Sequence, residues 1–78
     1  MLRDSSLRLF LLGILDREDL VDDTIAIFRE LRDKHTASGE TLLMASVYLA
    51  ARKTGMSYTV EQVNRMFGSP SVLWVKYV

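Results

Sequence analysis

Apolar residues recur along the chain at the three- and four-residue spacing of one helix face. The first stretch follows "DSS", where Asp4 or Ser5 can cap a helix. Its apolar positions keep the helical repeat at Leu7, Phe10, Leu11, Ile14 and Leu15. Leu9 and Leu12 add apolar residues to other faces. We therefore expect a first helix that is buried on more than one side.

A second helix is predicted after the break "DREDL", with its start between Val21 and Asp23. Acidic residues fall in its first turn and basic residues in its last, which complements the helix dipole. Its core positions are Val21, Ile25, Phe28 and Leu31. The turn residues of "TASG" then interrupt the pattern.

The third predicted helix covers about residues 40–54 and is rich in small side chains. They include Ala45, Ser46, Ala50 and Ala51. Because small residues on several faces let neighbouring helices approach closely, we expect this helix to be central and surrounded by the others. Gly55 is placed to end it in a left-handed conformation.

Two further elements complete an all-α, five-helix bundle formed by a single domain, residues 1–78. Thr59 and Gln62 have the spacing of a capping box and open a fourth helix, which Gly68 ends. The last segment, "SVLWVKYV", could form a strand on propensity alone. Ser69 as a cap and Pro70 at the first helical position favour a fifth helix.

Composition limits the functional class. The chain has 78 residues and no Cys, so disulfides and thiolate metal sites are excluded. Its formal net charge is zero, which gives no overall attraction to nucleic acid. No stretch approaches the roughly 20 apolar residues of a membrane span. We expect an intracellular protein of the cytoplasm, nucleoid or nucleus, without a membrane role.

The segment from Ala45 to Val63 resembles a cyclin-like repeat, specifically a core repeat of general transcription factor IIB and its archaeal counterparts. That family has a small-residue helix ending in an aromatic-apolar-Ala-x-Arg pattern, matched here by "YLAAR" from Tyr48 to Arg52. A basic-to-glycine turn follows, matched by "KTG", and then a threonine-started helix, matched from Thr59 to Phe67.

This resemblance implies a cyclin-like fold and a non-enzymatic domain that docks a protein of the transcription machinery, with DNA as a further partner. The family carries two such repeats and a zinc ribbon, whereas this chain has one repeat and no Cys. The last predicted helix of this chain is short and apolar, and Lys76 is its single basic residue. A repeat that is truncated within its last helix would have this appearance. Protein docking is therefore the first expectation.

Four basic residues are the candidate contacts to an acidic partner or to phosphates: Arg52, Lys53, Arg65 and Lys76. In the resembled family, the region of Arg52 and Lys53 helps to contact promoter DNA or the TATA-binding protein. The alternative role of Arg52 and Lys53 is only to complement a helix C-terminus.

An alternative function for the chain is that of a small helix-turn-helix regulator that binds DNA through residues 59–78. Few side chains in this segment are suited to contact base edges.

No catalytic, cofactor or metal site is expected. His35 stands alone without a nucleophile motif, and no serine lies in a Gly-x-Ser-x-Gly elbow. The acidic residues from Asp16 to Asp23 lack the spacing of a calcium loop and are typical of a helix start. We therefore expect that the chain is not an enzyme.

The apolar C-terminus leaves two alternatives open. Trp74, Tyr77 and Val78 either complete the core or form an exposed surface for a second copy or another partner. In the second case the chain would be a structural module that self-associates, as a homodimer, through its C-terminal aromatic segment.

Overall fold

The computed structural model describes residues 4–15 and 17–78, and over these residues the protein is all-α, without a β-strand. Four α-helices are followed by one short 3-10 helix. They are α1 (Asp4–Ile14), α2 (Glu18–Lys34), α3 (Gly39–Lys53), α4 (Val60–Phe67) and η1 (Leu73–Tyr77). The all-α prediction is therefore confirmed.

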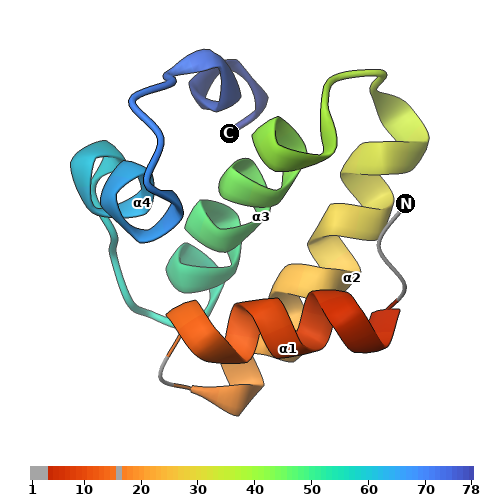
Figure 1. Ribbon diagram of the computed structural model, residues 1–78, viewed down its shortest axis with the longest axis vertical. Helices are drawn as coiled ribbons and strands as arrows, with labels where there is room; N and C mark the ends of the chain where they lie inside the picture. The colour runs from red at the N-terminus through yellow and green to blue at the C-terminus, as the bar shows by residue number, and fades with distance from the viewer. Residues whose placement is uncertain (1–3, 16) are drawn as a thin grey trace.

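Helix α3 lies in the middle of the molecule (Figure 1). Helix α2 packs along one side of it, while α4 and η1 pack on the other. Helix α1 crosses the lower end of this arrangement and contacts α2. All of the residues from Leu42 to Val47 are buried, as are Ala50 and Ala51. The small side chains of α3 thus do what the sequence indicated, since they let helices approach from several directions.

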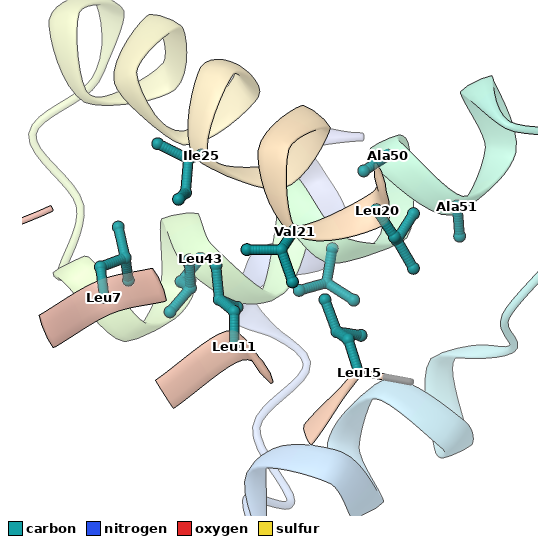
Figure 2. Close-up of a cluster of buried hydrophobic side chains, with 10 residues drawn as sticks. Leu7, Leu11, Leu15, Leu20, Val21, Ile25, Leu43, Ala50 and Ala51 are labelled. Atoms are coloured by element: carbon teal, nitrogen blue, oxygen red, sulfur yellow. The ribbon is translucent and has the colours of Figure 1, made fainter. Parts of the chain in front are cut away.

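The main core forms where α1 meets α2 and α3. Leu7 and Leu11 of α1, and Leu15 directly after its end, are buried at four-residue intervals. Figure 2 shows them facing the side chains of the other two helices. The opposing residues are Leu20, Val21 and Ile25 from α2 and Leu43, Val47, Ala50 and Ala51 from α3. A second cluster of Met44, Ala45, Val63 and Trp74 joins α3 to α4 and η1.

Helix α1 is buried on one side only, which corrects the expectation from sequence. Leu9 is 71% exposed and Leu12 is 37% exposed. No other described element covers enough of α1 to bury both faces, because the remaining helices all gather around α3. The helix begins at Asp4, so Ser5 lies inside it rather than at its cap, and the cap position itself falls outside the described residues.

The ends of the later helices follow local chemistry. Ser38 caps α3, because its hydroxyl oxygen accepts a hydrogen bond from the backbone N–H of Thr41 at 3.2 Å. The predicted capping box of α4 is confirmed in both of its halves, between Thr59 and Gln62. Gly55 is also confirmed as the residue that ends α3, with a φ of +83°. Helix α2 begins at Glu18, three residues earlier than predicted, and so includes more of the acidic segment.

The fifth element differs from the α-helix predicted for "SPSVLWVKYV". The structure forms a five-residue 3-10 helix, and Pro70 lies before it rather than at its first position. Two serine hydroxyls explain the change, because Ser69 accepts from the N–H of Ser71 and Ser71 accepts from the N–H of Leu73. These local bonds hold the backbone in turns and compete with an α-helical start.

Candidate functional site

An apolar pocket of about 480 Å³ opens between α1, the second half of α2, the start of α3 and the end of α4. This volume lies within the range of about 300–1,000 Å³ that is usual for ligand sites. Its walls are mainly apolar, and all three phenylalanines of the chain contribute to them. The lining residues are Leu7, Phe10, Phe28, Arg32, Ala37, Gly39, Glu40, Leu42, Leu43 and Phe67.

Ring contacts hold the aromatic walls of this pocket. The rings of Phe10 and Phe67 lie 5.8 Å apart between centroids, in a tilted arrangement that joins α1 to α4. The guanidinium of Arg32 lies 5.7 Å from the centre of the Phe28 ring, which is within the range of a cation–π contact. Phe10 nevertheless remains 44% exposed. The pocket can therefore receive apolar groups from solvent and offers them one cation and the carboxylate of Glu40.

Arg52 and Lys53 lie at the C-terminal end of α3, where the sequence placed them, and both are exposed. The guanidinium of Arg52 lies 5.9 Å from the centre of the Tyr48 ring. The Lys53 Nζ atom lies 3.9 Å from Oδ1 of Asp23 on α2. An exposed pair at this distance contributes little to stability, so both cations remain accessible to an anionic partner.

Arg65 and Lys76 lie apart from Arg52 and Lys53, and no ion pair among the described residues links the four side chains. Arg65 donates to Glu61 one turn earlier on α4, at 2.9 Å. Lys76 belongs to η1, whose Tyr77 ring packs against His35 just before the start of α3. Since α3 has 15 residues, its two ends are about 20 Å apart. Lys76 therefore lies near the opposite end of α3 from Arg52 and Lys53.

The C-terminal residues divide between the two alternatives that the sequence left open. Trp74 is fully buried, donates a 2.9 Å hydrogen bond to Asn64, and lies 5.4 Å from the Tyr48 ring between centroids. Tyr77 is half-buried against His35, while Val78 is 42% exposed. Trp74 is thus a core residue, and the exposed apolar surface of this segment consists instead of Val72, Leu73, Val75 and Val78.

The acidic segment pairs with cations of its own chain. The carboxylate of Asp22 accepts from Arg8, and that of Asp23 faces Lys53. Asp19 forms a two-bond pair with Arg17, at 2.6 and 3.2 Å. The hydrogen bond from Arg17 lowers the pKa of Asp19 below its ordinary value, and the same bond raises the pKa of Arg17. In residues 4–15 and 17–78, no group of three or more His, Cys, Asp or Glu side chains could hold a metal ion.

Sequence reasoning did not find the phenylalanine-lined pocket. Phe10, Phe28 and Phe67 each fit an apolar helix face, so nothing in the periodicity marked them as partly exposed. They are separated by 18 and 39 positions, and only the packing of three helices brings them together. One sequence signal was available, namely the apolar residues on every face of α1. One neighbouring layer of helices covers only one face of such a helix, so some of these residues must stay exposed.

Comparison with models of protein families, with curated proteins and with solved structures gives no match for this chain. No helix within the described residues is both long enough and apolar enough to cross a membrane.

Proposed function

We propose that the protein is a non-enzymatic docking module, a single cyclin-like domain similar to a repeat of transcription factor IIB, that binds a protein of the transcription machinery. The single observation that carries this proposal is the phenylalanine-lined pocket beside the start of α3. Aromatic pockets that remain open at the surface bind the apolar side chains of partner proteins, because the buried contact area supplies the affinity.

The cyclin-like part of the proposal is drawn from the sequence resemblance over residues 45–63. A small-residue helix is surrounded by its neighbours, and a short turn and a capped helix follow it. The residues that carry the resemblance have structural roles in this chain. The "KTG" turn ends α3, since the N–H of Gly55 donates to Arg52 and that of Met56 donates to Ala51. The resemblance therefore rests on fold-forming residues, while the partner surface lies elsewhere.

The chemistry of the pocket indicates what a partner must provide. Bulky apolar side chains would contact Phe10 and Phe28, and an acidic group would meet the guanidinium of Arg32. Arg52 and Lys53 form a separate cationic area at the other end of α3 and are the residues available to DNA. Two cations would neutralise few phosphates, so any binding of DNA would be weak and sensitive to salt.

The experiment is a calorimetric titration of the chain with the TATA-binding protein of the organism that encodes it, alone and on a promoter duplex, at low salt. We expect a dissociation constant in the range of about 1–50 µM for the protein partner. Ala37→Trp fills the pocket from its rim and should abolish binding. Ala26→Trp, the same change at an exposed position on α2, is the matched control and should leave binding intact.

Two results separate the parts of the proposal. Binding to the duplex alone that disappears in Arg52→Glu/Lys53→Glu would establish the DNA contact. Absence of any heat with the TATA-binding protein, free or on DNA, at about 50 µM would overturn transcription docking as the function. Equal affinity of the Ala37→Trp and Ala26→Trp variants would show that the pocket is not the docking surface.

A further inference from the structure

The phenylalanine-lined pocket reaches from the surface into the hydrophobic core. Its floor is formed by Leu7, Leu42 and Leu43, which are only 2%, 1% and 5% exposed. Phe10 is 44% exposed and borders the mouth, where a molecule can enter from solvent. A shallow surface depression would be lined by exposed residues throughout, whereas a molecule in this pocket would contact side chains of the core. The pocket can therefore enclose most of the surface of a small ligand.

The volume and the walls of the pocket indicate the size and polarity of such a ligand. A water occupies about 30 Å³ in the liquid, and at this share for each non-hydrogen atom about 480 Å³ holds roughly 16 atoms. The half-buried rings of Phe28 and Phe67 form walls that offer no hydrogen bond. A polar group placed against them would lose its hydrogen bonds to water without replacement. The body of the ligand should therefore be apolar.

One charge at the pocket is held in position. The guanidinium of Arg32 lies 5.7 Å from the centre of the Phe28 ring, so a wall of the pocket fixes it. No carboxylate within residues 4–15 and 17–78 forms an ion pair with Arg32. Glu40 also lines the pocket, but it is exposed and no hydrogen bond or ion pair among the described residues positions its carboxylate. Glu40 can therefore turn to water, while Arg32 remains to bind an anionic group.

We infer that the pocket binds an apolar monocarboxylate of the size of a medium-chain fatty acid, and that this ligand and the docked partner exclude each other. The carboxylate of the ligand pairs with Arg32, and its chain lies against the three phenylalanines. The bound chain then occupies the space that the apolar side chains of a partner would fill. The ligand site requires only the pocket, whereas this regulation of docking rests on the proposed function.

Calorimetric titration of the full chain with decanoate, which has about 12 non-hydrogen atoms, tests the ligand site. We expect a dissociation constant on the order of 100 µM. Decyltrimethylammonium has the same chain and the opposite charge, and it should bind at least tenfold more weakly. Equal or tighter binding of this cation would overturn the assignment of the charge to Arg32. Absence of any decanoate binding at about 1 mM would overturn the inference as a whole.

Methyl NMR during the same titration locates the bound ligand. The methyl resonances of Leu42 and Leu43 on the pocket floor should shift with decanoate. Leu73 is the control, because it is 64% exposed on η1 and does not line the pocket. A shift of Leu73 as large as that of Leu42 would show adsorption to exposed apolar surface instead of binding in the pocket.

Two charge-neutralising variants test the contact with Arg32. Arg32→Gln should weaken the binding of decanoate at least fivefold and should remain folded, because the side chain is exposed. Lys34→Gln removes a charge from the same last turn of α2 at an exposed position outside the pocket, and it should bind like the wild type. Circular dichroism confirms that both variants are folded. An equal loss in the two variants would contradict the role of Arg32.

A competition experiment separates this inference from the proposed function. At about 1 mM, decanoate should weaken the binding of the TATA-binding protein about tenfold, since its concentration is then about ten times its dissociation constant. Partner binding that decanoate leaves unchanged would overturn the mutual exclusion. Binding of decanoate to a chain that does not bind the TATA-binding protein would overturn the docking function and its regulation, but it would establish the ligand site.

Discussion

The indole Nε1 of Trp74 donates a hydrogen bond to Oδ1 of Asn64 at 2.9 Å, and this bond attaches η1 to α4. Trp74 has no exposed surface, so its indole N–H depends on this acceptor within the folded protein. The relationship explains how a five-residue 3-10 helix is held against the bundle. It also explains why Trp74 is unavailable as a docking residue.

Asn64→Ala should destabilise the protein by about 1–3 kcal/mol, because the buried indole N–H would lose its acceptor. Urea denaturation followed by Trp74 fluorescence measures this change. Asn64→Asp keeps an acceptor oxygen at the same place and is the matched control, with a smaller expected loss. Equal stability of wild type and Asn64→Ala would show that the bond contributes nothing.

Removal of the α4 cap should also be measurable. In Thr59→Ala, the N–H of Gln62 loses the hydroxyl that it donates to at 3.1 Å, and we expect a loss of about 1 kcal/mol. Helix α4 has only eight residues, so it depends strongly on its first turn. Ser57→Ala, two residues earlier on an exposed loop position, should change the free energy of unfolding by less than about 0.5 kcal/mol. A loss as large as that of Thr59→Ala in this control would contradict the capping explanation.

The same glycine-to-alanine change should have opposite effects at two positions. Gly55 has a φ of +83°, so Gly55→Ala should cost about 1–2 kcal/mol. Gly13 lies in the last turn of α1 with open space around it, so Gly13→Ala should stabilise the protein by about 0.4–1 kcal/mol. Thermal unfolding measures the free-energy change of both variants. Two changes of the same sign would contradict the backbone assignments.

The pair between Arg17 and Asp19 should be visible in a pH titration. Because the hydrogen bond from Arg17 lowers the pKa of the folded Asp19, its stabilisation is present above the ordinary pKa of aspartate and is lost as the pH falls through the lowered value. Arg17→Ala should raise the pKa of Asp19, as measured by carboxyl carbon NMR. Arg65→Ala removes a cation that pairs only with Glu61 in the described contacts and should leave Asp19 unchanged. An unchanged Asp19 titration in Arg17→Ala would refute the pairing.

Local signals in the sequence located most helix ends correctly. Thr59, Gln62 and Gly55 act through neighbours within five positions, so their roles follow from spacing alone. The fifth element was less predictable, since its residues favour no single local structure. The hydroxyls of Ser69 and Ser71 and the burial of Trp74 together determine a 3-10 turn there.

The sequence by itself determined the all-α class, the four α-helices and the central position of α3, because helical periodicity, caps and small residues act over a single turn or face. Only the tertiary structure decided which apolar residues remain outside. Whether Leu9, Phe10 or Trp74 is covered depends on where other helices lie, and helical spacing is the same for a residue facing the core and for one facing solvent. The phenylalanine-lined pocket and the exposure of Leu9, Phe10 and Leu12 on α1 therefore emerged only from the packing of segments far apart in the chain.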